Sequence, residues 1–183
     1  MLVLNISLMK KILAFAGSNN SKSINHQLVT FAAALLEDVE VEVLDIRTWD
    51  VPIYSIDMDP DVTPSLINDL IERIAKADGF IISSPEHNGG PSAFLKNILD
   101  WLSRRSKKVF TNKPMLLMST SPGGGGGANH LGSLVKGLPY QGAKITSTFS
   151  LPSFNDNMKD GNMTDEYVSQ LKENLDLLKA ALV

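Results

Sequence analysis

The chain has 183 residues, of which 43% are hydrophobic and 20% are charged, and its formal net charge is -3. These values are typical of one globular domain with a buried core, and the absence of a basic block argues against a nucleic-acid or anionic-membrane partner. No cysteine occurs, which excludes disulfides, a thiolate nucleophile and cysteine-ligated metals. We therefore expect a single cytoplasmic domain over residues 1–183.

The N-terminal segment contains two candidate start sites. Residues 1–8 precede Met9, which begins the run MKKILAFAGS. The apolar run after Lys10 and Lys11 is shorter than that of a secretory signal peptide, and no stretch is long enough to span a bilayer. We predict that Met9 is the natural start and that residues 1–8 are an N-terminal extension.

Strand-like and helix-like segments alternate along the rest of the chain. Apolar or alternating runs predict five strands, over residues 11–16, 40–45, 79–82, 113–120 and 144–149. Apolar residues at helical spacing predict helices over residues 25–36, 64–77, 92–103, 128–138 and 164–182. Pro91 is expected to open the third helix and Thr164 to cap the last, in which Leu171, Leu175, Leu178 and Leu182 would face inward. Such alternation predicts an α/β fold, in which a five-stranded, doubly wound parallel sheet is covered by helices on both faces.

Three polar loops follow strands one, three and four, so in such a sheet they open on the same carboxyl edge, where ligands bind. The first loop, GSNNSKSIN over residues 17–25, gathers hydroxyl and amide side chains at a helix N-terminus. Free N–H groups and the helix dipole favour a phosphate there, whereas helix capping by Ser23 or Asn25 is the alternative interpretation. A nucleoside triphosphatase is excluded because Lys22 stands where the Walker pattern requires a second glycine.

The central loop, residues 85–90, contains Asn88-Gly89-Gly90, which can adopt positive φ and turn backbone N–H groups outward. His87 at its tip could stack on a flat ligand or donate a hydrogen bond to it, or could be an exposed turn residue.

The third loop, residues 121–127, holds five consecutive glycines. It is either a flexible surface loop or one that moves over or closely approaches a ligand. His26, His87 and His130 lie on different segments without carboxylates at ligand spacing, so no metal site is expected. Trp49 and Trp101 are expected in the core or at an interface.

The segment PEHNGGPSAFLKNILDWLSR, residues 85–104, resembles the signature of the NADPH-dependent FMN reductase family. These flavodoxin-like enzymes include azo, quinone and chromate reductases, and their loop usually reads Pro-Glu-Tyr-Asn. GSNNSKSIN resembles the family's phosphate loop, and STSPGGGGGA, residues 119–128, resembles its glycine-rich loop. The similarity runs from about residue 10 to 137 and implies a flavodoxin-like three-layer α/β/α sandwich with strand order 2-1-3-4-5.

The resemblance also implies the residues that bind FMN. The first loop would hold the phosphate, the central loop would line the isoalloxazine, and the glycine loop would close the other side of the flavin. Position by position, the implied residues are Ser18, Asn20, Ser23, Ile24 and Asn25, then Pro85, Glu86, His87, Asn88 and Gly89, then Ser121 and Gly123. Asn20 stands where the family often has arginine, so the phosphate would rely on neutral donors, the helix dipole and Lys22. His87 stands where tyrosine is usual, which would affect how acceptors stack.

The implied activity is an NAD(P)H-dependent reductase in which hydride passes from NADPH or NADH to FMN and on to a quinone, azo or similar small-molecule acceptor. No catalytic side chain is expected, because the cofactor carries the chemistry. The family implies a homodimer or homotetramer, with Glu86 and Arg104 at a subunit contact.

Three other functions are compatible with the sequence. A flavodoxin-like electron carrier would bind FMN without nicotinamide turnover, and a non-enzymatic flavin-binding redox module would bind FMN without reducing acceptors. A Rossmann-type oxidoreductase would use Gly123, Gly125 and Ala128 to bind NAD(P) without flavin, although the next strand ends without an acidic ribose ligand.

Overall fold

A five-stranded parallel sheet forms the centre of the protein, whose computed structural model describes residues 9–59 and 63–182. Its strands are β1 (Lys11–Ala16), β2 (Glu40–Leu44), β3 (Gly79–Ser83), β6 (Pro114–Thr120) and β7 (Lys144–Leu151). All neighbouring pairs are parallel, and the order is β2-β1-β3-β6-β7. Counted along the chain this is 2-1-3-4-5, so the predicted topology is confirmed. The N-terminal extension expected over residues 1–8 lies outside the described residues.

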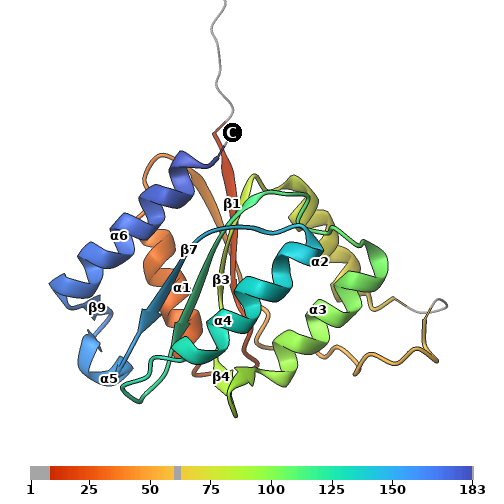
Figure 1. Cartoon of the computed structure of the whole chain (residues 1–183), viewed down its shortest axis with the longest axis horizontal. Helices are drawn as coiled ribbons and strands as arrows, with labels where there is room; N and C mark the ends of the chain where they lie inside the picture. The colour runs from red at the N-terminus through yellow and green to blue at the C-terminus, as the bar shows by residue number, and fades with distance from the viewer. Residues whose placement is uncertain (1–8, 60–62, 183) are drawn as a thin grey trace, which may run out of the picture.

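Helices cover both faces of the sheet, which gives the predicted three layers (Figure 1). On one face lie α1 (Ile24–Ala34) and α6 (Asp165–Ala180), and on the other lie α2 (Ser65–Lys76), α3 (Ala93–Arg105) and α4 (Ala128–Gly137). Side chains of β1 alternate between the two cores: Leu13 and Phe15 pack with α2 and α3, whereas Ile12 and Ala14 pack with α1 and α6. This alternation follows from the two-residue repeat of a strand.

The middle of the sheet explains why continuous apolar runs were a reliable strand signal. Every residue of β3 and β6 is buried, because helices cover both of their faces. The edge strand β2 is only partly buried, and its Glu42 forms ion pairs with Lys11 and Arg73. None of the helices in the described part of the chain has the length and apolar character needed to cross a membrane.

The central loop differs from its prediction. Pro91 does not open α3, which begins at Ala93 after the N-cap residue Ser92. Instead, a small hairpin pairs β4 (Glu86–His87) with β5 (Gly90–Pro91). Asn88 and Gly89 turn the chain with φ of 53° and 76°, as Asn-Gly does in two-residue hairpin turns. The expected positive φ is thus found at Asn88 and Gly89 but not at Gly90.

The C-terminal region contains small elements that were not predicted: η1 (Leu138–Gln141), α5 (Phe154–Asn157), β8 (Met158–Lys159) and β9 (Asn162–Met163). In α6 the three leucines 171, 175 and 178 are buried as expected, and Leu182 packs on the same core beyond the helix end. Thr164 occupies the N-cap position, but its hydroxyl makes no capping hydrogen bond.

Trp101 in α3 is fully buried, and its ring N–H donates to the Pro52 carbonyl at 2.8 Å. Its predicted place in the core is therefore confirmed.

Candidate active site

The three loops predicted to meet at the carboxyl edge do so, at the end of the sheet where β4 is labelled in Figure 1. Together they enclose a cleft of about 420 Å³, called here the main cleft. Most of the predicted site residues line it: Ser18, Asn20, Ser23, Ile24, Asn25, Pro85, Glu86, His87 and Ser121. Asn19, Lys22, Ser92, Thr120 and Pro122 complete the lining, whereas Asn88, Gly89 and Gly123 lie outside it.

The first loop is wound tightly by its own polar side chains. Ser18 Oγ accepts from the Asn20 N–H at 3.3 Å, and Asn20 Oδ1 accepts from the Lys22 N–H at 2.9 Å. Ser23 caps α1 by accepting from the His26 N–H at 3.1 Å. The N–H groups of Ile24 and Asn25 have no preceding helical turn to bond to, so they are available for an anion. Capping and anion binding are therefore compatible in this loop.

Asn25 links the first loop to the ends of two strands. Its side-chain Nδ2 donates to the Thr120 carbonyl at 3.1 Å, and its Oδ1 accepts from the Thr120 N–H at 3.2 Å and from Ser83 Oγ at 2.7 Å. The residue is 2% exposed. The side-chain oxygen of Asn25 is thus bonded within the protein. Asn25 would therefore bind an anion through its backbone N–H, which lies in the first turn of α1.

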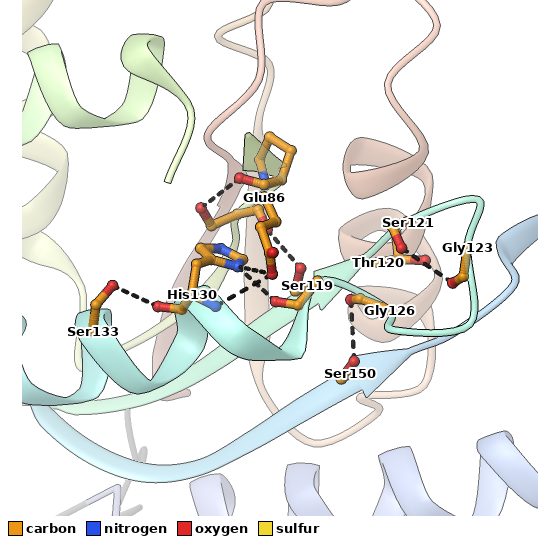
Figure 2. Close-up of polar contacts among 12 residues, drawn as sticks. Glu86, Ser119, Thr120, Ser121, Gly123, Gly126, His130, Ser133 and Ser150 are labelled. Carbon is orange, nitrogen blue, oxygen red and sulfur yellow. Dashed lines mark hydrogen bonds and ion pairs between the residues drawn. The ribbon is translucent and has the colours of Figure 1, made fainter. Parts of the chain in front are cut away.

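The glycine loop has two halves with different reasons for lacking side chains. Gly126 and Gly127 have φ of 58° and 73°, and an added Cβ would collide with Ser150 Oγ or Ser119 Oγ. Their close approach is therefore to the protein's own strands, β7 and β6. Figure 2 shows Gly126 beside Ser150, whose Oγ donates to the Gly126 carbonyl at 3.1 Å. At the exposed residues 123–125, an added Cβ would meet nothing within 4 Å. This half matches the surface-loop interpretation.

Glu86 and His130 form a contact that the sequence did not reveal (Figure 2). Glu86 Oε2 accepts from the His130 backbone N–H at 3.3 Å and lies 3.5 Å from its ring Nδ1. The ring is completely buried, and its Nδ1 lies 2.6 Å from the Gly127 carbonyl oxygen. No local pattern marks a lone helical histidine whose partner is 44 residues away. Within the chain this carboxylate points towards α4, and the subunit contact of Glu86 stays a prediction.

Charges near the first loop are mostly paired. Arg47 donates to the Ser21 carbonyl at 2.6 Å and also binds both carboxylate oxygens of Asp45. These hydrogen bonds hold the pKa of the Asp45 carboxyl well below its usual range. Burial, followed by the charge of Arg47, lowers the pKa of His26. Lys22 is exposed and forms no ion pair within the described residues, which leaves its charge available at the main cleft.

A second hollow of about 250 Å³, the side cleft, adjoins the main cleft and shares Asn19, His87 and Ser92 with it. Its remaining walls are mainly apolar and come from Val51, Ile53, Ala93, Phe94 and Asn97. Asn97 positions one wall, because its Oδ1 accepts from the Tyr54 N–H at 2.8 Å and its Nδ2 donates to the Val51 and Pro52 carbonyls. His87 is exposed and stands between the two hollows.

Other hollows lie away from these loops, and the two larger ones differ in character. One, of about 460 Å³ at the β2 edge, is lined by charged side chains that include the paired Lys11, Glu42 and Arg73. The other, of about 480 Å³, lies between α1 and the β8–β9 hairpin and is largely apolar. Within residues 9–59 and 63–182, no group of three His, Cys, Asp or Glu side chains could hold a metal ion.

A family model described as NADPH-dependent FMN reductase matches residues 10–156. The chain belongs to the NADPH-dependent FMN reductase family. The family predicted from the three loops is thereby confirmed, together with FMN and NAD(P)H as the cofactors of an oxidoreductase.

Individual relatives agree with this family. An NADPH:quinone oxidoreductase of Arabidopsis thaliana is 31% identical over 181 residues, which cover 93% of this chain and 90% of the relative. The NADH:(hydroxy)cinnamate reductase subunit CrdA of Vibrio ruber is 34% identical over 112 residues, or 61% of this chain. That match spans 54% of the Vibrio ruber protein, so this chain corresponds to about half of its length.

Among solved structures, the flavoenzyme NAD(P)H:(acceptor) oxidoreductase FerB of Paracoccus denitrificans superposes with a TM-score of 0.76 at 26% identity. The superposition covers 96% of this chain and 100% of that one. The flavodoxin-like fold predicted for this member of the FMN reductase family is therefore confirmed.

Proposed function

We propose that this protein is an NAD(P)H-dependent FMN reductase that passes two electrons to a quinone, azo or similar small-molecule acceptor. The observation that carries the proposal is the main cleft, which joins a helix N-terminus rich in neutral donors to an outward-facing hairpin and a glycine loop. Its volume of about 420 Å³ falls in the range of cofactor clefts, roughly 300–1,000 Å³. Family membership supports the same conclusion.

The phosphate of FMN would lie at the N-terminus of α1. Ser18, Asn20 and Ser23 would surround it, and the free N–H groups of Ile24 and Asn25 would donate to it together with the helix dipole. Lys22 lines the main cleft close to this position and is exposed, whereas the guanidinium of Arg47 is paired with Asp45. Neutral donors and a partial dipole charge would thus replace the arginine that is common in the family.

The isoalloxazine would lie between the central hairpin and the glycine loop. Pro85, Glu86 and His87 would line one side, with the N–H groups of the Asn88–Gly89 turn at its edge, and Ser121 and Gly123 would lie on the other. Bound FMN supplies the redox chemistry by accepting a hydride and releasing two electrons. The protein's part is to orient the ring, keep one face accessible and offer backbone N–H groups to the negative charge that develops on reduction.

The side cleft supports an aromatic acceptor. It opens beside His87 and is walled by the apolar side chains of Val51, Ile53 and Phe94, which suit a flat, largely apolar molecule. The polar side chains of Asn19 and Asn97 at its margin could bond carbonyl oxygens. A quinone combines both features, and quinone reductases are found among the relatives.

A cytoplasmic location and a homodimer or homotetramer belong to the same proposal. Tyr140 and Ile56 are 85% and 74% exposed, and each would be a candidate contact in such an assembly. Arg104, predicted at a subunit contact, lies with its guanidinium 5.5 Å from the centre of the Tyr54 ring. Sedimentation analysis at several concentrations would give the oligomeric state.

The decisive experiment is an absorption spectrum of the protein after loading with FMN and desalting, followed by anaerobic addition of NADPH or NADH. A retained flavin spectrum that bleaches, and recovers on addition of a quinone, is the expected result. Retained flavin that does not bleach would indicate an electron carrier or a redox module instead. Tight NAD(P) binding without flavin would indicate a Rossmann-type oxidoreductase.

A further inference from the structure

Helix α4 is capped by a residue from another loop. Its own N-cap residue is Gly127, which has no side chain and could not carry one, because Ser119 Oγ occupies that space. A capping side chain normally accepts from the second or third N–H of the helix. Here the carboxylate of Glu86 accepts from His130, the third helical residue, at 3.3 Å. A negative charge at this position also interacts favourably with the helix dipole.

The His130 ring reinforces this contact. Its Nδ1 lies 2.6 Å from the Gly127 carbonyl oxygen, and since a carbonyl can only accept, Nδ1 carries the proton. The same Nδ1 lies 3.5 Å from Glu86 Oε2. The other ring nitrogen, Nε2, is buried and has no hydrogen-bond partner among the described residues. The ring is therefore a buried group whose polar contacts are directed to Gly127 and Glu86.

This contact joins two walls of the main cleft. Glu86 begins the hairpin that follows β3, and Gly127 ends the glycine loop that follows β6. The hairpin tip has little support of its own, because His87, Asn88 and Gly89 are exposed and an added Cβ at Gly89 would meet nothing within 4 Å. At the base of the hairpin, Ser119 Oγ donates to the Ser84 carbonyl at 2.8 Å, and the Glu86 side chain adds the contact to the N-terminus of α4.

We propose that His130 is a positioning residue, which holds Glu86 and through it the hairpin of residues 86–91 in the place required for flavin binding. The inference rests on the proposed function, because it assigns the hairpin and the glycine loop to the two sides of the isoalloxazine. His130 itself does not line the main cleft and would act only through Glu86 and Gly127.

A double-mutant cycle tests this coupling. Glu86→Ala, His130→Ala and the double variant are titrated with FMN, and the quenching of flavin fluorescence is measured. Each single change is expected to weaken FMN binding on the order of tenfold. The loss in the double variant should fall well short of the product of the two single losses, because His130→Ala removes the ring that lies 3.5 Å from Glu86 Oε2 and Glu86→Ala removes the carboxylate that the ring approaches. His130→Ala keeps the backbone N–H from which Glu86 accepts. Losses that multiply to about a hundredfold would overturn the proposal.

A conservative replacement of His130 distinguishes a positioning role of its side chain from a general effect on folding. His130→Asn retains a side-chain N–H where Nδ1 stands and should restore most of the FMN affinity that His130→Ala loses. Ser133→Ala is the matched control, since Ser133 Oγ donates to the His130 carbonyl at 2.7 Å without touching Glu86, and its FMN affinity should equal that of wild type. Equal affinity of His130→Asn and His130→Ala would count against the proposal.

Hydrogen exchange of backbone amides tests the contact between Glu86 and the His130 N–H in the absence of flavin. In the flavin-free protein, the His130 amide should exchange faster in Glu86→Ala than in wild type, while amides of β6 should be unchanged. An unchanged His130 amide would overturn the inference. If wild type itself fails to bind FMN, the proposed function fails, whereas the exchange result still reports whether Glu86 caps α4.

Discussion

Asn25 and Thr120 exchange two hydrogen bonds through the Asn25 side chain, at 3.1 and 3.2 Å, although they are 95 residues apart. The same side chain accepts from Ser83, so one buried amide links the phosphate loop to the ends of β3 and β6. The geometry of the main cleft therefore depends on a residue whose side chain faces into the protein.

Replacing Asn25 by alanine should destabilise the protein by about 2–4 kcal/mol, because each buried polar group left unpaired costs roughly 1–3 kcal/mol. The free energy of unfolding, measured in urea, checks this value. Asn20→Ala, an exposed change in the same loop, is the control and should cost under about 1 kcal/mol. A similar loss in both variants would show that the buried amide has no special role.

The phosphate assignment predicts a difference between two flavins. Changing Ser18 and Ser23 together to alanine removes two hydroxyls at the N-terminus of α1 and should weaken FMN binding by about tenfold or more, since hydrogen bonds to a charged group contribute roughly 1.5–3 kcal/mol each. Riboflavin, which lacks the phosphate, should bind wild type and variant equally. Thr30→Ala, on an exposed turn of the same helix, controls for helix stability. An equal loss for both flavins would point to a disturbed fold.

Adding a positive charge at Asn20 should strengthen FMN binding. Asn20→Arg adds a cation at the exposed rim of the main cleft, and charge-assisted hydrogen bonds to phosphate are about twice as strong as neutral ones. FMN affinity should rise several-fold at low ionic strength and the gain should shrink in high salt, while riboflavin affinity should not change. A salt-independent gain would argue against the electrostatic cause.

The two halves of the glycine loop predict opposite mutational outcomes. Gly127→Ala should destabilise by about 2–4 kcal/mol, since alanine would be strained at this positive φ and would collide with Ser119. Gly124→Ala adds a methyl group in open space and should be neutral or stabilise by up to about 1 kcal/mol, because it restricts the unfolded chain. Thermal unfolding of the two variants measures the contrast, and equal melting temperatures would contradict it.

These residues also mark the limit of prediction from sequence. The apolar runs of β3 and β6 identified the central strands because both are buried on two faces. The hairpin at Asn88–Gly89 is absent from the prediction, although Asn-Gly is a strong hairpin signal, because a proline at position 91 also indicates a helix start. His130 could not be assigned, since its partner Glu86 comes close only after β3 and β6 pair. The need for glycine at 126 and 127 likewise comes from the approach of Ser150 and Ser119 in the folded sheet.

The Asp45–Arg47 pair predicts a pH dependence of stability. The hydrogen bonds from Arg47 are the largest cause of the lowered pKa of the Asp45 carboxyl. A depressed folded-state pKa contributes stability that is complete above the unfolded pKa, about 3.9, and is lost as the pH falls towards the folded value. Asp45→Asn should therefore be less stable than wild type at pH 7, and the difference should narrow as the pH drops below about 4. Asp50→Asn, which removes an exposed carboxylate from the same segment, controls for net charge. A stability difference between wild type and Asp45→Asn that widens at low pH would contradict a lowered pKa of Asp45 in the folded protein.

His87 should control which acceptors react. Its side chain is exposed and borders both the main cleft and the side cleft, so a larger ring at this position changes the passage between them without touching the phosphate site. His87→Tyr should therefore retain FMN, because tyrosine also presents a flat ring with a polar edge to the isoalloxazine and leaves the phosphate site unchanged. The ratio of kcat/KM between a bulky naphthoquinone and a small benzoquinone should shift. The second ring of the naphthoquinone would contact the apolar walls at Val51, Ile53 and Phe94, whereas a benzoquinone has no such ring. Ile53→Ala shortens one of these walls, and it should change the same ratio while leaving the rate of flavin reduction by NAD(P)H unchanged. Identical ratios in wild type and both variants would show that acceptors react without entering the side cleft.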